Sequence, residues 1–167
     1  NPIKEAGLVR FAAPKMISSM IKGGDEVASH YLQPRIGTDI ELLTAIAKAV
    51  DELGGINHPF IQDYTNGFAQ FVKSIRAQNW DTLARTCGVS TAEINQVAKL
   101  YNKSHHVIFA WGMGVTHHLH GVTNIESISN LALMRGMVGR QSAGLLPLRG
   151  HSNVQGIGTI GVKPVLP

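Results

Sequence analysis

The sequence predicts an α/β fold that is rich in helix and contains a small parallel sheet. Three observations support this prediction. An apolar, β-prone run at 107–111 is closed by glycines and followed by a helical pattern over 121–137, the strand, turn and helix from which parallel sheets are built. Helical periodicities fill the preceding region, from about 39 to 104. A polar, glycine-rich loop follows the strand-turn-helix unit.

The first forty residues contain a short predicted strand and a candidate anion site. Residues 8–11 could form an edge strand, and 15–30 are predicted to be loop with room for one helical turn. A helix is predicted to begin at Thr38 or Asp39, because apolar residues recur with helical spacing beyond it and acidic residues lie in its first turn. Gly37 before this helix could form an anion site, or the Gly-Thr-Asp sequence could be an ordinary helix cap.

The middle of the chain, over about 39–104, is predicted to be a helical scaffold that carries no chemistry. Residues 66–77 place aromatic and aliphatic side chains on one stripe, and Ser90 begins a capping box with Glu93. Cys87 is the single cysteine, which excludes a disulfide framework and a zinc or iron–sulfur site made by this chain's own thiolates. We interpret Cys87 as a small buried residue, although its position before a helix N-terminus would also favour a thiolate.

The unit at 107–138 and the loop at 140–161 contain the candidate binding residues. Ligands on parallel sheets bind at the carboxyl ends of the strands, so a nucleotide should lie at the Gly112-Met113-Gly114 turn. In the loop, glycines let the backbone approach a ligand closely, while arginine, histidine and amide side chains supply hydrogen-bonding groups. They suggest an anionic ligand with many hydrogen-bonding edges, such as a nucleotide or a pterin. The alternative interpretation is a polar surface turn.

The same region carries a family resemblance. It reads WGMGVTHHLHGVTNIESISNLALMRGMVGRQSAGLLPLRGHSNVQG, which closely resembles the molybdopterin-guanine-dinucleotide oxidoreductases, specifically formate dehydrogenase alpha subunits and their formate-dehydrogenase-like relatives. Looser similarity through AGLVRF, RIGTDIELL and TNGFAQF extends it over essentially all 167 residues. The resemblance implies that 1–167 is one internal segment of a Rossmann-like, molybdopterin-binding domain in a longer enzyme.

The resemblance also implies a cofactor and a set of binding residues. Family members bind two molybdopterin guanine dinucleotides around one molybdenum or tungsten, and a 4Fe-4S cluster carries the electrons away. Arg149 matches the arginine that holds a small anionic substrate, such as formate, beside the metal, and a guanidinium suits a carboxylate because it donates two parallel hydrogen bonds. The positions that match cofactor-binding residues are Gly37, Thr38, Asp39, Gly112, Met113, Gly114, His117, Gly150, His151, Asn153, Gln155 and Gly156.

Two features depart from the formate dehydrogenase pattern. Position 151 is His in RGHSNVQG, where formate dehydrogenases proper usually carry Gln in RGQNNVQG, and the His form resembles the formate-dehydrogenase-like branch. The chain also has no cysteine cluster for an iron–sulfur centre and no residue that matches the family's metal-ligating cysteine or selenocysteine. We therefore expect the metal and cluster ligands to lie outside this chain, and the segment alone to be inactive.

Two other patterns could be mistaken for sites. His117, His118 and His120 could be metal ligands, but a closed zinc site needs about four ligands, and no cysteine or paired carboxylate accompanies these three. We therefore prefer the pterin contact that the resemblance implies for His117. Residues 156–161 match GxGxxG, but this pattern needs a strand before it and a helix after it. We interpret that match as accidental for a nicotinamide site.

Composition leaves a rival interpretation open. The chain is 44% hydrophobic and 16% charged, which is typical of a globular domain, and its net charge of +4 suits a nucleic acid or a cofactor with pyrophosphates. The rival is a nucleotide- or nucleic-acid-binding module without redox chemistry, and a third possibility is a helical scaffold that binds nothing. Basic residues form no stripe and aromatics are only 6%, so we expect no nucleic-acid partner.

The hydropathy of the sequence also bears on location. No apolar run approaches the roughly 18 residues of a membrane span, and no signal peptide opens the sequence. We expect no membrane span and a cytoplasmic location. The resemblance implies that the partners are a small anionic substrate, the rest of the polypeptide and an electron acceptor.

Overall fold

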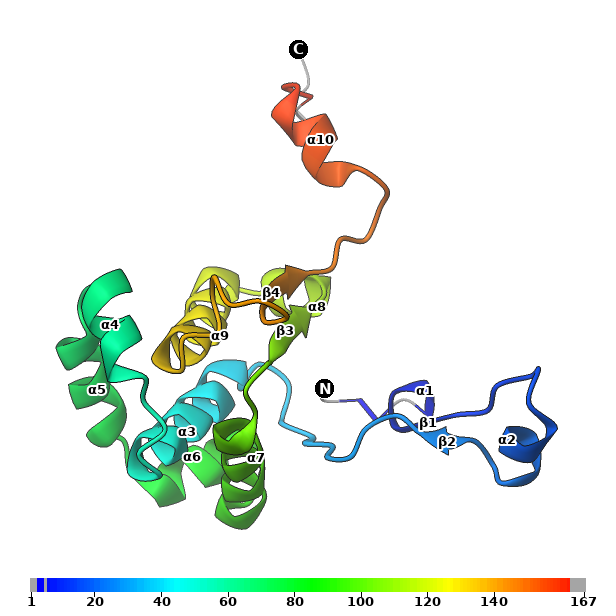
Figure 1. Cartoon of the computed structure of the whole chain (residues 1–167), viewed down its shortest axis with the longest axis horizontal. Coiled ribbons are helices and arrows are strands. Elements are labelled where there is room, and N and C mark those ends of the chain that lie inside the picture. The colour runs from blue at the N-terminus through cyan, green and yellow to red at the C-terminus, as the bar shows by residue number, and fades with distance from the viewer. Residues whose placement is uncertain (1–2, 5, 163–167) are drawn as a thin grey trace.

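The chain forms a helical body with an arm at each end, in a computed structural model that describes residues 3–4 and 6–162 (Figure 1). The N-terminal arm holds α1 (Ala6–Val9), β1 (Arg10–Phe11), α2 (Ile17–Ile21) and β2 (Asp25–Glu26), and β1 pairs antiparallel with β2. The body holds α3 (Asp39–Glu52), α4 (His58–Tyr64), α5 (Phe68–Arg76), α6 (Trp80–Cys87), α7 (Thr91–Lys103), β3 (Ile108–Trp111), α8 (Met113–Thr116), α9 (Gly121–Met134) and β4 (Gly144–Pro147). The C-terminal arm carries α10 (Val154–Thr159).

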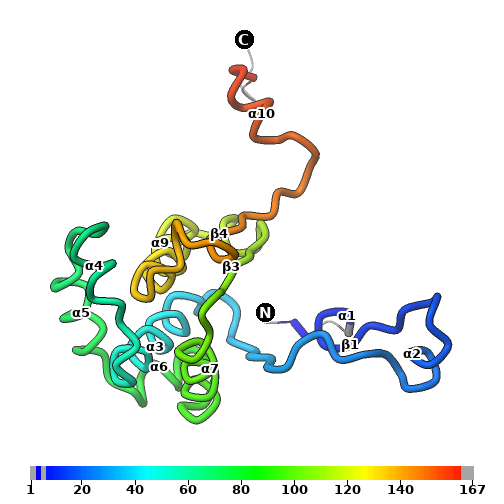
Figure 2. The backbone as a smooth tube through the Cα atoms, viewed as in Figure 1, coloured from blue at the N-terminus to red at the C-terminus, as the bar shows by residue number. Residues whose placement is uncertain are grey.

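Helix α3 is the centre of the body. It packs against α5, α6, α7 and α9, and the tube in Figure 2 shows it between these helices. All residues over 45–50 are buried, although an amphipathic surface helix would bury only one stripe. Small side chains at Ala45, Ala47 and Ala49 let neighbouring helices approach from several sides. The packing of the body therefore depends mainly on this one helix.

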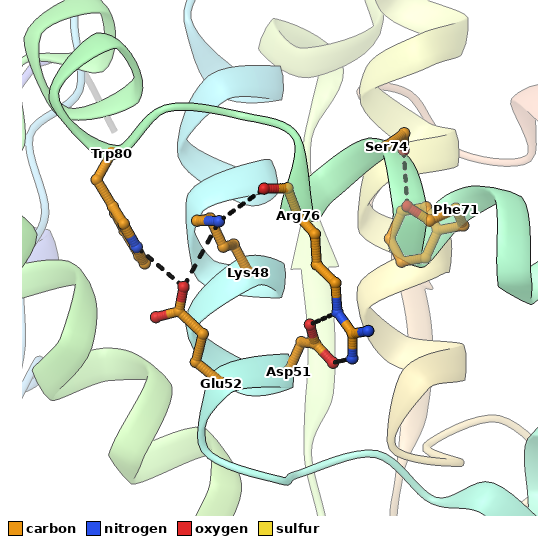
Figure 3. A network of polar contacts seen from close by, with 7 residues as sticks. All are labelled: Lys48, Asp51, Glu52, Phe71, Ser74, Arg76 and Trp80. Atoms are coloured by element: carbon orange, nitrogen blue, oxygen red, sulfur yellow. Dashed lines mark hydrogen bonds and ion pairs between the residues drawn. The ribbon is translucent and has the colours of Figure 1, made fainter.

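A polar network fixes the C-terminal half of α3 to α5 and α6 (Figure 3). Lys48 is buried, and its Nζ donates to the Arg76 carbonyl at 3.1 Å and lies 3.5 Å from the Glu52 carboxylate. The Trp80 indole N–H donates to the same carboxylate at 3.0 Å. The Arg76 guanidinium donates two hydrogen bonds, of 2.6 and 2.8 Å, to the Asp51 carboxylate. The buried ammonium of Lys48 is thus paired, as a buried charge requires.

Side-chain caps define the starts of α6 and α7, and the capping box at Ser90 confirms the prediction made for it. Ser90 forms both halves of a capping box with Glu93, and the hydrogen bonds from Ser90 lower the pKa of that carboxyl. Asn79 accepts from the Thr82 N–H at 3.0 Å at the start of α6. Cys87 is fully buried, which confirms its interpretation as a small core residue. These features form between residues close in sequence, so the sequence alone could predict them.

The parallel sheet consists of β3 and β4, which confirms the predicted α/β class. The pairing runs from Ile108 opposite Gly144 to Trp111 opposite Pro147, and α8 and α9 connect the two strands. Phe109 packs against the core, whereas Ile108 is 58% exposed, so one face of the sheet is covered by the body. The two-residue period of a strand produces this alternation.

Several predicted boundaries are wrong. Residues 140–161 are not one loop, because they contain β4 and α10. The turn after β3 is a short helix, α8, that begins directly after Gly112. Helix α9 ends at Met134 and not at 137, because Gly136 has φ +64° and cannot continue it. The predicted strand at 8–11 keeps only its second half, β1.

Tyr101 joins α7, α9 and β3 in the core. Its hydroxyl donates to the Leu131 carbonyl at 2.8 Å, and its ring meets Phe109 edge-on with centroids 5.6 Å apart. The Arg135 guanidinium lies 5.2 Å from the ring centroid. Burial raises the pKa of the Tyr101 phenol well above its ordinary value. The phenol therefore remains protonated as a hydrogen-bond donor in the folded state.

We expect Tyr101→Phe to lower the free energy of unfolding at neutral pH by about 1 kcal/mol, because the substitution removes one buried hydrogen bond and leaves the Leu131 carbonyl without this donor. Urea unfolding followed by circular dichroism measures the change. Tyr64→Phe is the matched control, because Tyr64 is 73% exposed and its hydroxyl has no hydrogen bond to a described residue. Equal stability of the Tyr101 variant and the wild type would contradict the assigned contact.

The raised pKa of Tyr101 predicts a further loss of stability in alkali. In the unfolded chain the phenol ionises with a pKa of about 10, whereas the buried phenol stays protonated. Its contribution to stability is complete below about pH 10 and is lost as the pH rises toward the folded-state pKa. The difference in unfolding free energy between wild type and Tyr101→Phe should therefore shrink between about pH 9 and about pH 11. A constant difference would be inconsistent with the raised pKa.

Candidate functional site

The two parallel strands end at one edge, where the two glycine motifs meet. Gly112 and α8 follow β3, while Arg149 and Gly150 follow β4. The Leu148 N–H donates to the Trp111 carbonyl at 2.8 Å, which extends the pairing one residue beyond β4. A Cβ at Gly150 would lie 2.5 Å from Met113 Sδ, so these segments are in contact. Glycine at 150 permits that close approach.

A cleft of about 470 Å³ lies between the turn after β3 and the segment before α3. It therefore brings together two regions more than seventy positions apart in the sequence. Four of the predicted cofactor-binding residues line it, namely Gly37, Asp39, Gly112 and Gly114. The full lining is Ile36, Gly37, Asp39, Ala110, Trp111, Gly112, Gly114, Val115 and His118.

The glycines in this cleft leave space that the described part of the chain does not fill. A Cβ added at Gly112 or Gly114 would meet no described atom within 4 Å. At Gly37, φ is +82° and an added Cβ would lie 3.3 Å from His118 Nε2. Packing among the described residues thus requires glycine at 37 but not at 112 or 114. The open backbone at the latter two positions suits a bound ligand that approaches closely.

Three hollows are larger than this cleft, and none of them is lined by a predicted binding residue. One, of about 650 Å³, lies between the N-terminal arm and the junction of α6 and α7. A second, of about 630 Å³, runs along α9. The third, of about 480 Å³, lies between α4 and the segment that follows α9. Volume alone therefore does not identify the site, and the glycine-lined cleft is the better candidate because of its position at the strand ends.

The N-terminus of α3 forms one wall of the cleft. Thr38 is its N-cap, but the Thr38 hydroxyl donates to the Arg35 carbonyl at 2.7 Å and does not cap the helix. The first backbone N–H groups of α3 therefore have no side-chain acceptor from Thr38, and the helix dipole favours an anion at this end. Asp39 opposes this effect with its own negative charge. It also offers carboxylate oxygens as acceptors on the cleft surface.

The opposite wall is fixed to α9 by two buried residues. The Asn124 side-chain amide donates to the Val115 carbonyl at 3.0 Å, and Asn124 is only 1% exposed. A Cβ at Gly121 would overlap the Thr116 carbonyl, so this glycine lets α9 begin directly against α8. The orientation of α8 thus depends on contacts with α9 as well as on the strand before it.

Of the adjacent histidines, His118 lines the cleft and His117 does not. His118 is half-buried, whereas His117 is exposed and its backbone N–H donates to Met113 at 2.7 Å. His118 is considered above only as a possible metal ligand and not as a cofactor-binding residue. It lies beyond the end of α8 at Thr116, so its position depends on the bend that follows this helix. No pattern in the sequence marks that bend.

The remaining predicted residues lie on the C-terminal segment, which leaves the body in Figure 2. Arg149 and His151 are exposed and make no hydrogen bond or ion pair with a described residue. Asn153 is the N-cap of α10 with φ +55°, and its side chain covers Gly156. Gln155 lies in the same helix. The described chain therefore does not bring His151, Asn153, Gln155 or Gly156 to the cleft.

Neither a metal-binding group nor a membrane helix is found among the described residues. Over 3–4 and 6–162, no three His, Cys, Asp or Glu side chains are grouped so that they could hold a metal ion. In the same ranges, no helix is both long and apolar enough to cross a membrane.

Known proteins resemble this chain over most of its length. A family model described as molybdopterin oxidoreductase matches residues 15–164. Protein YdeP of Escherichia coli (strain K12) is 36% identical over 97% of this chain and 23% of its own length. Uncharacterized oxidoreductase Rv2900c of Mycobacterium tuberculosis (strain ATCC 25618 / H37Rv) is 32% identical over 100% of this chain and 22% of its own. Formate dehydrogenase H of Escherichia coli (strain K12) is 32% identical over 83% and 19%.

A solved structure supports the fold. Acetylene hydratase from Pelobacter acetylenicus matches with a TM-score of 0.65 and 17% sequence identity, covering 69% of this chain and 16% of that chain. The chain spans less than a quarter of the length of the curated relatives it matches. Because the family model matches residues 15–164, the chain belongs to the molybdopterin oxidoreductase family.

Proposed function

We propose that this chain forms part of the binding site for a bis-molybdopterin guanine dinucleotide cofactor in a formate-dehydrogenase-like oxidoreductase. Family membership supports a molybdopterin cofactor with its metal. The observation that carries the finer proposal is the cleft at the strand ends, where Gly112 and Gly114 expose backbone to open space. A planar pterin or a diphosphate could lie against that backbone without meeting a side chain.

The chemistry of the cleft fits a guanine dinucleotide. Asp39 offers carboxylate oxygens that could accept the N–H groups of a guanine edge, and Trp111 offers an aromatic surface. The uncapped N-terminus of α3 offers backbone N–H groups to a phosphate. Met113 and His117 are proposed to contact the pterin, as in the resembled family. A cofactor-binding role is also proposed for Thr38 and for four residues of the C-terminal arm, His151, Asn153, Gln155 and Gly156. For these four, the proposal requires the arm to lie along the cofactor.

Arg149 is proposed to hold a small anionic substrate. It follows β4 by two residues, and the contact between Gly150 and Met113 keeps its backbone beside the cofactor turn. Its guanidinium has no acceptor among the described residues, so its donors are available to a carboxylate. The 32% identity with formate dehydrogenase H supports an anion of that size.

The bound cofactor would supply a two-electron redox centre at molybdenum or tungsten. This chain's residues would bind and orient the cofactor and the substrate, while the metal-ligating residue and the 4Fe-4S cluster ligands would lie outside 1–167. On this proposal the segment alone is inactive. The tests below therefore use the complete protein, purified without oxygen.

The first test adds a methyl group to the open space beside the glycines. Gly112→Ala and Gly114→Ala meet no described atom, so the fold should tolerate both substitutions. A ligand against that backbone would be displaced, and we expect cofactor retention to fall by about tenfold. Pterin fluorescence and metal analysis measure it. Gly7→Ala on α1 is the control, because its added Cβ also meets nothing within 4 Å and it lies outside the proposed site. Unchanged pterin and metal in both cleft variants would refute the assignment of this cleft.

The second test concerns Arg149. We expect Arg149→Gln to raise the KM for formate by about tenfold or more while pterin and metal content stay unchanged, because a charge-assisted hydrogen bond to the substrate is lost. Arg149→Lys should recover only part of this loss, since lysine cannot donate in a bidentate fork. An electron-transfer dye assay measures turnover. Wild-type kinetics in a fully loaded Arg149→Gln variant would show that the arginine does not hold the substrate.

A further inference from the structure

His118 lies in the cleft beside Gly37, which belongs to the opposite wall. Its ring lines the cleft, and Nε2 lies 3.3 Å from the position that a Cβ on Gly37 would take. Its neighbours do not line the cleft: His117 and His120 are exposed, and Leu119 is 92% exposed, although the His120 ring centroid lies 6.1 Å from that of His118. Within 117–120, His118 is therefore the side chain that can reach a ligand bound between the two walls.

A backbone hydrogen bond fixes which nitrogen of His118 can donate. The His120 N–H donates to His118 Nδ1 at 3.2 Å. A ring nitrogen that accepts a hydrogen bond carries no proton, so the neutral imidazole must hold its proton on Nε2. No described residue accepts from Nε2, which faces Gly37. The cleft thus contains an N–H donor of fixed direction whose acceptor is not supplied by the described chain.

The surroundings of His118 favour an anionic oxygen as that acceptor. The residues that share the cleft offer backbone N–H groups at the N-terminus of α3 and the bare backbone at Gly112 and Gly114. Asp39 is the acidic residue among them, and its carboxylate would repel an anion placed directly against it. An extended ligand would satisfy both Asp39 and His118, because it could place a hydrogen-bond donor edge at Asp39 and an anionic group at His118. A metal ion is disfavoured, because no group of three ligating side chains occurs among the described residues.

We infer that His118 is a binding residue whose Nε2–H donates to a phosphate oxygen of a nucleoside diphosphate group held in this cleft. Gly37 belongs to the same proposed binding site, because the side chain of any larger residue would lie close to His118 Nε2 and block its hydrogen bond to the ligand. The inference deepens the proposed function and rests on it for the identity of the nucleotide. It assigns the phosphate contact to the second histidine of the pair, separately from the pterin contact proposed for His117.

The test measures binding of guanosine diphosphate to the complete protein, produced in a host that cannot make molybdopterin so that the cleft is free. Isothermal titration calorimetry compares the wild type with three variants. His118→Leu removes the donor and should weaken binding by about tenfold or more, the effect of losing a hydrogen bond to a charged group. His118→Gln retains an N–H in a similar place and should bind within about threefold of the wild type. His120→Leu retains the backbone N–H and is the matched control.

The outcomes separate this inference from the proposed function. Equal affinity of His118→Leu and wild type would overturn it, as would the absence of guanosine diphosphate binding by the wild type. Pterin and metal content of the wild-type protein from an ordinary host decides the proposed function independently. If that protein lacked pterin while nucleotide binding still depended on His118, the redox proposal would fail and the phosphate contact would stand. If His118→Gln binds guanosine diphosphate nearly as well as the wild type, the weaker binding of His118→Leu is due to the lost donor and not to a disturbed fold.

Discussion

The candidate site depends on the register of β3 and β4. Because Trp111 pairs with Pro147, both strands stop at the same level and each is followed at once by a glycine motif. Parallel strands cannot be joined by a tight turn, so α8 and α9 must lie between them. The connection that completes the sheet therefore also supplies one wall of the cleft. A shift of one residue in this pairing would separate Gly150 from Met113 and turn the apolar face of β4 away from the core.

The same helices contribute to the core and to the cleft. Helix α3 contributes the buried run at 45–50 to the core, while its first turn borders the cleft. Helix α9 contributes Leu131 and Ala132 to the core, while Asn124 holds the Val115 carbonyl of α8. The walls of the cleft are therefore the exposed ends of well-packed elements.

The sequence predicted the elements that local signals define. Ser90 and Glu93 form a capping box three positions apart, and the apolar periodicity over 40–50 marks α3, so no distant contact is needed to find them. Strand β4 is different, because four residues without clear alternation become a strand only through pairing with β3. Helix α10 contains Gly156 and Gly158, which disfavour helix, and no pattern indicates it. His118 was not predicted as a cleft residue for a related reason, since its position depends on the bend that follows the short helix α8.

The cleft residues were predictable as types of residue but not as a group. The Gly112 and Gly114 motif is visible in the sequence, and so is Gly37 before its helix. Their meeting across more than seventy positions follows from the packing of α3 against α9, which no single-sequence pattern records. The exposed C-terminal segment was recognised as polar and glycine-rich, but its distance from the cleft could not be read from composition.

The contact between Gly150 and Met113 ties together the segments that follow β3 and β4. The thioether of Met113 lies where a side chain at 150 would have to go, so any larger residue there would displace the methionine or the backbone that carries it. A single methyl group at position 150 would therefore alter the geometry at the ends of both strands. The flexible side chain of methionine can absorb only part of that change.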